Sequence, residues 1–405
     1  MLSNFLQEEY QNYKTFNSIP CLYENPEETL AEWSMKASAY FKEEEIFIKH
    51  LQSRINNQKN DLTKKRLNSL LQGRSYNLKQ IKKLLSDFSA KENTQTIFSS
   101  QQIHSYFELA FRDWAWGEKE LDSYLRIAEG VNFENKSVLI LGSGAGGFSQ
   151  RLAERNPSAQ FINVEHNPLL ATIHNQIANG KEVKLHEVCE YPKEVELTCV
   201  KRSLKAENKT SNQAVILGSF PDLPFKDNIF DIIIAPWFFD ILDLPFINAI
   251  VGTKDFLKLE GSLLFFGPSN IHKKELNERL CSEEIIEVFQ DNFKNVSSFR
   301  NRISYLESPL SSQNRQEEVL FIQASHSKEY TKDFNLDFSE IDLKFTPEFE
   351  QYKLVADIKA KILSHINEDV SVDGLAKILE EKFGLTSHES KPYAKKFLDK
   401  IKFEY

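Results

Sequence analysis

An apolar strand pattern runs through four glycines into a helical pattern in Val138-Leu-Ile-Leu-Gly142-Ser-Gly144-Ala-Gly146-Gly147-Phe-Ser-Gln-Arg-Leu152. Glycine permits a tight turn and lets a ligand approach the backbone closely. The helix that follows offers unpaired N–H groups and the positive end of its dipole at its first turn. The segment therefore predicts a site for a nucleoside-containing cofactor. The alternative is a glycine turn that serves packing alone.

A carboxylate ends the next apolar strand pattern, Phe161-Ile-Asn-Val-Glu165. At that position Glu165 can accept hydrogen bonds from both hydroxyls of a ribose. However, Gly142, Gly144 and Gly147 also satisfy the dinucleotide fingerprint G-x-G-x-x-G. These residues alone therefore leave a nicotinamide or flavin dinucleotide open beside S-adenosylmethionine.

Short apolar runs alternate with helical stretches from about residue 137 to 325. Such alternation is typical of βαβ units and predicts an α/β fold with a largely parallel sheet. The predicted strands are Ser137–Leu141, Gln160–Val164, Ala214–Leu217, Ile229–Ala235, Ser262–Phe266 and Val319–Ala324.

Both ends of the chain have helical spacing. The first hundred residues are predicted as helices, one of them starting at Asn25-Pro26. After a polar linker at 327–350, three short helices are expected, and Thr386 with Glu389 has the spacing of a capping box. We therefore expect a helical N-terminal region (1–97), an α/β domain (98–330) and a small helical domain (345–405).

Composition and charge limit the classes of function that the chain can have. Fifty Lys and Arg against 59 Asp and Glu give a net charge of −9, opposite in sign to a global nucleic-acid footprint. The segment 49–83 is basic; we interpret it as a solvated helical face, with an acidic partner or nucleic acid as the alternative. The four cysteines lack C-x-x-C pairing, and no signal or membrane segment is apparent. Free thiols and a cytoplasmic location are expected, without a metal.

Two further segments carry a resemblance. Gly218-Ser-Phe-Pro-Asp-Leu-Pro-Phe225, followed by Phe230-Asp231, resembles the third and fourth strands of class I S-adenosylmethionine-dependent methyltransferases. Leu257-Lys-Leu-Glu-Gly261 is similar to the turn before their fifth strand. The resemblance covers about 110–326 and implies a Rossmann-like sheet that binds S-adenosylmethionine. Ser219 replaces the acid that usually contacts the adenine amine, and Phe220 is expected to stack on the adenine.

A second resemblance is to the carnosine N-methyltransferase-like family. It rests on Arg112-Asp113-Trp114 with Gly117 and Glu118, on Trp237-Phe-Phe-Asp240, and on Ser304-Tyr305 before the last strand. It implies that Asp240 and Tyr305 surround the methyl acceptor. Further tyrosines of that family are not matched, so carnosine is not predicted as the acceptor. The C-terminal helices distantly resemble PqqD-type domains through Lys382-Phe-Gly-Leu385; a helical cap is the alternative.

Each candidate side chain has a structural alternative. Asp240 orients or deprotonates the acceptor, or else caps a helix. Tyr305 hydrogen-bonds the acceptor or simply packs, and Arg112 pairs with the cofactor carboxylate or, as the alternative, with Asp113 or Glu118. The predicted catalytic residues are Asp240 and Tyr305. The predicted cofactor residues are Gly142, Ser143, Gly144, Gly146, Glu165, His166, Ser219, Phe220, Pro236 and Arg112.

The resulting hypothesis is an S-adenosylmethionine-dependent methyltransferase that acts on a small molecule or peptide, at nitrogen. Three alternatives stay open at this point: an NAD(P)-dependent oxidoreductase, a non-catalytic binding protein on the same fold, and a nucleic-acid methyltransferase that uses 49–83. The sequence does not name the acceptor or the oligomeric state.

Overall fold

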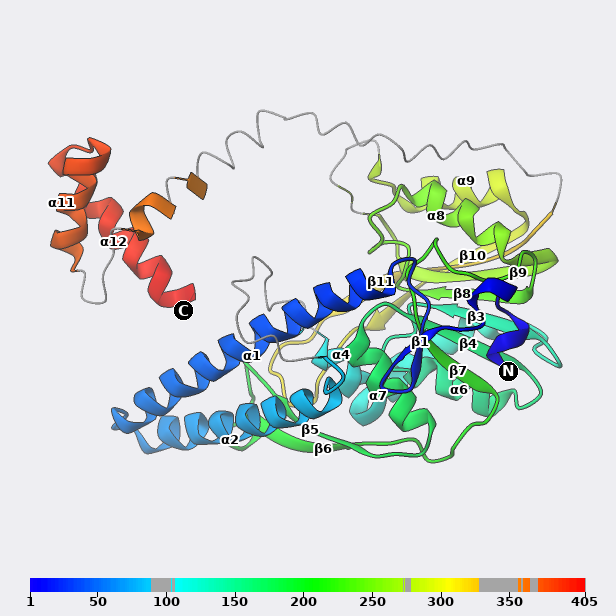
Figure 1. The fold of residues 1–405 in the computed structure, drawn as a ribbon, viewed down its shortest axis with the longest axis horizontal. Coiled ribbons are helices and arrows are strands. Elements are labelled where there is room, and N and C mark those ends of the chain that lie inside the picture. Colours follow the sequence, from blue (N-terminus) through cyan, green and yellow to red (C-terminus); the bar gives the residue numbers. More distant parts are fainter. Residues whose placement is uncertain are drawn as a thin grey trace. The chain divides into compact units, whose positions relative to one another are not determined.

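The computed structural model describes residues 1–88, 103, 106–271, 273, 278–327, 356–357, 360–364 and 371–404, with side chains up to 398. The chain divides into two compact units, Met1–Asp333 and Phe334–Tyr405, which are described separately (Figure 1). The predicted boundary at 97/98, the linker at 327–350 and the start of the last domain lie at or within segments outside the described residues.

A nine-stranded sheet forms the centre of the first unit, in the order β1-β2-β7-β4-β3-β8-β9-β11-β10. The strands from β2 to β9 pair in parallel, whereas β11 is antiparallel to both β9 and β10. The strand after which the glycine turn follows, β3, lies in the interior, and the chain builds outward from it in both directions, as in doubly wound sheets. The strands are β3 (Ser137–Leu141), β4 (Gln160–Glu165), β7 (Gln213–Leu217), β8 (Phe230–Pro236), β9 (Leu257–Pro268), β10 (Lys294–Ser304) and β11 (Gln316–Ser325).

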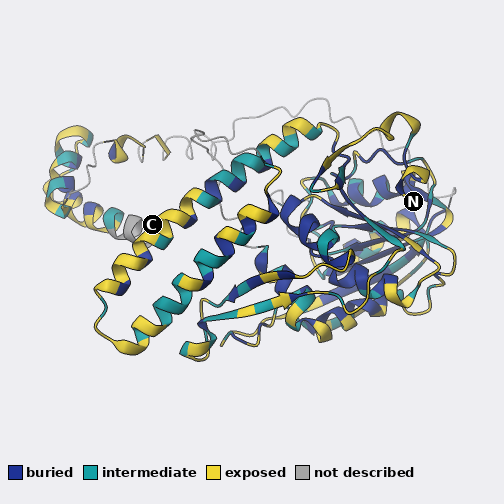
Figure 2. Cartoon of the chain, turned by 60° about the horizontal axis from the view of Figure 1, so that its bottom comes forward, coloured by how far each residue is buried: buried dark blue, intermediate teal, exposed yellow. Residues whose placement is uncertain are grey.

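All six predicted strands therefore form, and the predicted α/β class with a largely parallel, Rossmann-like sheet is confirmed. Successive residues of β3 point to opposite faces of the sheet, as a pleated strand requires. Val138 and Ile140 pack with α5 and α6, and Leu139 and Leu141 pack with α8 and α9 (Figure 2). The helices are α5 (Glu118–Tyr124), α6 (Gly147–Arg155), α7 (Pro168–Ala178), α8 (Phe246–Gly252) and α9 (Ser282–Asn292).

Two long helices come before β3 in the chain, α1 (Pro26–Asn56) and α2 (Asp61–Leu84). Asn60 begins α2, because its side chain accepts a hydrogen bond from the N–H of Thr63 over 2.9 Å. The two helices pack against each other, and α2 also packs on β5 (Val183–Val188) and β6 (Cys199–Leu204) (Figure 1). A short helix, α4 (Phe107–Phe111), then leads into a π-helical turn at Arg112–Trp116.

Two pairs of strands were not predicted. The short strands β1 (Lys14–Phe16) and β2 (Ile19–Cys21) extend the sheet edge, where Cys21 pairs with Leu217 of β7. Three residues are too few to show a period, so a strand that forms through a distant partner leaves no local signal. The hairpin β5–β6 did leave one, because Val183, Leu185 and Glu187 alternate inward along Val183–Val188.

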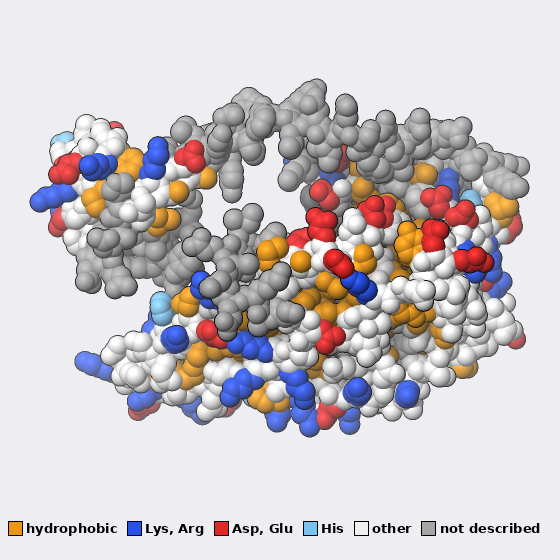
Figure 3. Space-filling view, in the orientation of Figure 1, with side chains coloured by type: hydrophobic (Ala, Val, Ile, Leu, Met, Phe, Trp, Pro, Cys, Tyr) orange, Lys and Arg blue, Asp and Glu red, His pale blue; other side chains and the backbone are white. Residues whose placement is uncertain are grey.

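The basic segment lies on the end of α1 and along α2. Part of its charge is paired: Lys65 with Glu196 at 2.5 Å, Lys82 with Glu45 at 2.6 Å, and Arg74 with Glu44. Figure 3 shows Lys and Arg side chains spread along the lower edge of the first unit rather than lining one groove. A solvated face, rather than a nucleic-acid contact, stays our prediction for this segment.

The second unit contains α11 (Val372–Phe383) and α12 (Ser387–Glu404). Gly384 ends α11 in the left-handed conformation, with φ +68°. Half of the predicted capping box before α12 forms: the Glu389 carboxylate accepts from the N–H of Thr386 at 3.0 Å, whereas the Thr386 hydroxyl donates to the same carboxylate at 2.7 Å instead of accepting from the N–H of Glu389. The predicted first helix, from 354 to 366, falls partly outside the described residues, of which 356–357 and 360–363 are helical.

Among the described residues, none of the helices combines the length and apolar character that crossing a membrane would require.

Candidate functional site

The glycine turn joins β3 to α6 at the carboxyl edge of the sheet. Gly142, Gly144 and Gly146 all have positive φ, at +67°, +59° and +93°. A Cβ on Gly142 would lie 2.7 Å from the ring of Phe238, and one on Gly146 would collide with the ring of His174. A Cβ on Gly144, in contrast, would meet nothing within 4 Å. Gly144 is therefore the residue at which the backbone faces open space for a ligand.

Glu165 ends β4 beside this turn. One carboxylate oxygen accepts a hydrogen bond from the N–H of Gly144 at 2.7 Å, and the other accepts from the N–H of Asn167 at 2.8 Å. The side chain is buried, at 8% exposure. Burial raises the pKa of Glu165, and the backbone N–H groups oppose that shift. The predicted ribose carboxylate is thus fixed against the turn.

The next residue, His166, is exposed and has aromatic neighbours from the N-terminal region. Its ring lies 5.5 Å from that of Tyr23 and 5.6 Å from that of Trp33, centroid to centroid. Its Nδ1 lies 3.0 Å from the hydroxyl oxygen of Ser219. His166 and Ser219, both predicted, are therefore brought together, and Tyr23 and Trp33 are additions that no local sequence signal indicates.

Phe220 is placed differently from the prediction. Its side chain is buried, and its ring packs edge-on against those of Phe238, Phe239 and Phe256. The ring belongs to the core beneath β7 and β8, so it is not open for stacking on an adenine. Phe220 thus anchors its loop in the apolar core, in place of the ligand contact that we expected. Ser143 is likewise buried, with its hydroxyl 3.4 Å from Nδ1 of His174.

Arg112 lies in a buried network of charges. Its Nε donates to Asp113 at 2.6 Å, and its Nη1 donates to Glu120 at 2.8 Å. Glu120 also accepts from the N–H of Leu306 at 2.8 Å, and Asp113 from the N–H of Gly147 at 3.0 Å. The network therefore ties the start of α6 to the loop after β10. Glu120, rather than the expected Glu118, is the second acid.

Asp113 occupies the N-terminal end of α6, where an anionic ligand group would otherwise bind. Its side chain is 2% exposed, and a Cβ on Gly147 would lie 2.8 Å from the Cβ of Asp113. The third glycine of the dinucleotide fingerprint is thus needed for packing against Asp113. The N–H of Gly147, in the first turn of α6, already donates to a carboxylate of the chain itself.

The acid after β8, Asp240, is largely shielded from solvent. Its Oδ1 is buried and has no hydrogen-bond partner among the described residues. Burial raises the pKa of Asp240, and the positive charge of Lys273 opposes the shift. An unpaired carboxylate oxygen of this kind fits a group that receives a hydrogen bond or a proton from a ligand.

Trp237 and Tyr305 lie next to one another at the same end of β8, which Pro236 closes. Their ring centroids are 4.7 Å apart, and the guanidinium of Arg315 lies 4.8 Å above the ring of Tyr305. Trp237 has a left-handed backbone (φ +48°), and its indole N–H is buried without a partner within the described chain. This orphaned donor makes Trp237 a further candidate site residue.

Within the described ranges, no three His, Cys, Asp or Glu side chains gather in a way that could hold a metal ion.

No family model and no curated protein sequence matches the chain. Among solved structures, phosphoethanolamine N-methyltransferase 2 of Haemonchus contortus is 12% identical, with a TM-score of 0.36 over 55% of this chain and 57% of that one. A SAM-dependent methyltransferase of Aquifex aeolicus is 14% identical, with a TM-score of 0.33 over 56% and 98% of the two chains. Precorrin-6y C5,15-methyltransferase of Geobacter metallireducens is 14% identical, with a TM-score of 0.31 over 50% and 86%.

This chain thus spans little more than half the length of the Haemonchus contortus enzyme. The fold assignment rests on the strand order of the chain itself. The resemblances to the carnosine N-methyltransferase-like family and to PqqD-type domains stay predictions.

Proposed function

We propose that the chain is an S-adenosylmethionine-dependent methyltransferase whose acceptor site lies at the end of β8. The observation that carries the proposal is the carboxylate of Asp113 on the N–H of Gly147. It places negative charge where the pyrophosphate of a dinucleotide would bind. A cofactor without phosphate avoids that repulsion, which favours S-adenosylmethionine over NAD(P).

The residues around the turn fit this cofactor. Gly144 leaves room for the ligand beside the turn, and Glu165 lies within hydrogen-bond distance of that backbone. His166 and Ser219 form the far side, where a base ring would contact the exposed imidazole. The Nη2 of Arg112 makes no hydrogen bond to a described residue, and we assign this nitrogen to the cofactor carboxylate.

When bound, S-adenosylmethionine supplies a methyl group on a positively charged sulfur. The protein has to hold the acceptor in line and remove a proton where the acceptor carries one. As the acceptor nitrogen gains the methyl group, Asp240 is placed to take its proton. Tyr305 and the indole N–H of Trp237 are placed to orient the acceptor.

The first test is calorimetric titration of the full chain with S-adenosylmethionine, S-adenosylhomocysteine, NAD+ and NADPH. We expect micromolar binding of the first two and none of the dinucleotides. Binding of a dinucleotide alone would overturn the proposal in favour of an oxidoreductase. Binding of no cofactor would favour a binding protein that retains only the fold.

The acceptor site is tested separately with Asp240→Asn. A methyltransferase that uses this acid should lose about 10²- to 10⁴-fold in turnover, while its affinity for S-adenosylmethionine stays within about twofold. Unchanged turnover would remove the proposed role of Asp240.

A further inference from the structure

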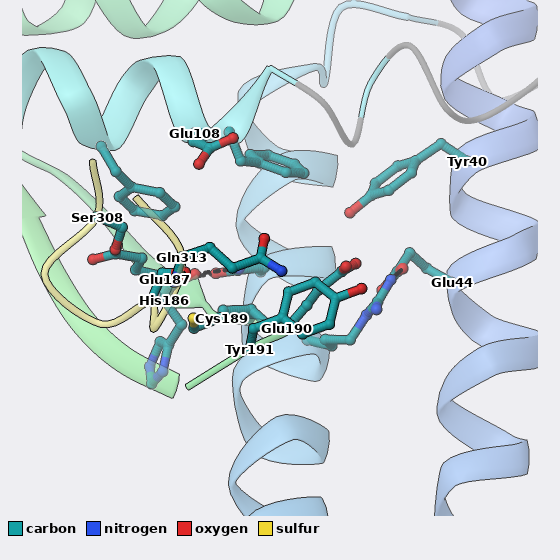
Figure 4. Close-up of a pocket in the computed structure, with 16 residues that line it drawn as sticks. Tyr40, Glu44, Glu108, His186, Glu187, Cys189, Glu190, Tyr191, Ser308 and Gln313 are labelled. Atoms are coloured by element: carbon teal, nitrogen blue, oxygen red, sulfur yellow. Dashed lines mark hydrogen bonds and ion pairs between the residues drawn. The ribbon is translucent and has the colours of Figure 1, made fainter. Parts of the chain in front are cut away.

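A cavity of 370 Å³ opens in the first unit away from the glycine turn (Figure 4). It lies among α1, α2, α4, the end of β5 with the segment that follows it, and the loop between β10 and β11. Its volume is within the range of sites that hold small organic molecules.

Aromatic rings form a large part of the wall. Tyr40 comes from α1, Phe107 and Phe111 come from α4, and Tyr191 comes from the segment after β5. The other three aromatic side chains are buried, whereas Tyr191 is 56% exposed. Aromatic faces attract cations as well as methylene groups.

The wall of the cavity carries more negative than positive charge. Four carboxylates line the cavity, and two of them have fixed cations: Glu44 is paired with Arg74, and Glu187 with Arg202 at 2.7 Å. Glu108 and Glu190 form no ion pair within the part of the chain that the structure describes. Figure 4 shows Glu108 directed from α4 toward the space that Tyr40 faces from α1.

The wall of the cavity shares segments of the chain with the candidate site. Phe111 immediately precedes Arg112, and Ser308 follows three residues after Tyr305 on the same loop. The hydroxyl of Ser308 donates to Glu187, and the indole of Trp116 donates to the same carboxylate at 3.0 Å. The wall of the cavity is thus built on the segments that hold Arg112 and Tyr305.

We propose that this cavity binds an amine-bearing cation, with its ammonium group against Glu108 and Glu190 and its methylene groups against the aromatic rings. Among the described residues, Trp237, Asp240 and Tyr305 do not line this cavity, so the inference adds a binding site beyond the proposed acceptor site. The binding of the cation itself does not depend on methyl transfer, so it can be measured without cofactor.

The experiment uses three probes of one length and different charge: 1,5-diaminopentane, 1,5-pentanediol and glutarate. Each is titrated calorimetrically into the full chain at low ionic strength, without cofactor, and into Glu108→Gln, Glu190→Gln and Glu134→Gln. The third variant makes the same change of charge at an exposed glutamate outside the cavity.

We expect binding of the diamine alone, weakened about 3- to 10-fold by each cavity variant and unchanged by the control. Added salt should weaken it further, because the contact is an exposed ion pair. Absence of diamine binding, or equal weakening by all three variants, would overturn the inference. If S-adenosylmethionine still bound in that case, the proposed function would stand; diamine binding without S-adenosylmethionine binding would support the cavity and reject the methyltransferase.

Discussion

Glu165 accepts a hydrogen bond from the backbone N–H of Gly144 over 2.7 Å, and this contact joins the end of β4 to the glycine turn. The second oxygen of the same carboxylate holds the N–H of Asn167, at the start of α7. One side chain therefore stabilises the two loops that border the proposed ribose site. Any substitution of Glu165 changes both the shape of the site and its chemistry.

For this reason Glu165→Gln tests the cofactor contact better than Glu165→Ala. Glutamine keeps one oxygen acceptor and the size of the side chain, whereas alanine leaves two buried N–H groups unsatisfied. We expect Glu165→Gln to weaken S-adenosylmethionine binding about 10- to 100-fold, the range for lost hydrogen bonds to a charged group. Calorimetry measures the affinity, and circular dichroism checks that the fold is kept. Unaltered affinity in a folded variant would place the ribose elsewhere.

Gly144→Ala and Gly146→Ala form a matched pair: the first should mainly impair cofactor binding, and the second should mainly destabilise the fold. A methyl group on Gly144 enters open space, so the left-handed backbone alone costs about 1–2 kcal/mol. A methyl group on Gly146 also collides with His174, which adds about 1–3 kcal/mol of overpacking. Urea unfolding should show the larger loss for Gly146→Ala. Titration should show that Gly144→Ala, although folded, has lost cofactor binding; retained binding would argue against a ligand at this backbone.

The parallel core of the fold could be predicted because its signals are local. Each buried strand is a short apolar run, and the run at Val138 is followed at once by the glycines that the turn requires. The short strands β1 and β2 could not be predicted, since three residues show no period and their place in the sheet depends on the pairing of Cys21 with Leu217 across the fold. The hairpin at Val183 was predictable in principle, because its alternation is visible in the sequence.

The site divides in the same way. Glu165 was identified because a strand end is a position that sequence can locate, whereas Asp240 followed from the resemblance to the carnosine N-methyltransferase-like family; Glu165 ends β4, and Asp240 follows β8. The core position of Phe220 and the contacts of Tyr23 with His166 depend on distant packing, so sequence gave no indication of either. Positions at strand ends could therefore be predicted, whereas contacts made by neighbouring elements could not.

Asp113→Asn should reveal how far the buried network supports the fold. The change removes the charge that faces Arg112 and weakens the acceptor for the N–H of Gly147. Loss of one partner from a buried ion pair costs about 3–5 kcal/mol, and Glu120 remains to reduce that cost, so we expect about 3 kcal/mol. Asp122→Asn, which alters exposed pairs with Arg151 and Arg155, should cost less than about 1 kcal/mol. Equal urea midpoints for the two variants would show that the buried network contributes no more to stability than the exposed pairs do.

Asp240→Asn should stabilise the protein while it impairs turnover. Burial raises the pKa of Asp240 in the folded state, so the folded protein holds this proton more tightly than the unfolded chain does. The contribution of Asp240 to stability is therefore complete at low pH and is lost as the pH rises through the raised pKa. Near pH 8 the asparagine variant should be more stable, by about 1 kcal/mol, because it lacks the buried unpaired charge. The gain should vanish toward pH 3.5; thermal unfolding at the two pH values measures it, and a gain independent of pH would assign it to packing.

Binding of 1,5-diaminopentane should weaken as the pH falls. Burial raises the pKa of Glu108, and the negative charges of Glu187, Glu120 and Glu190 raise it further, against an opposing effect of Arg315. A bound ammonium group favours the charged carboxylate, so the proton competes with the ligand below that pKa.

Affinity should therefore be constant near pH 8 and fall by up to about tenfold per pH unit in the acidic range, the limit for competition by one proton. His186, another residue of the cavity wall, has a pKa that burial and the positive charge of Lys201 lower; its positive charge, which also appears on acidification, adds to the loss. Titrations from pH 5 to 8 measure this profile. In Glu108→Gln the profile should become shallower, while the contribution of His186 remains. An identical profile in that variant would show that another group controls binding, because glutamine at position 108 has no proton to exchange in this range.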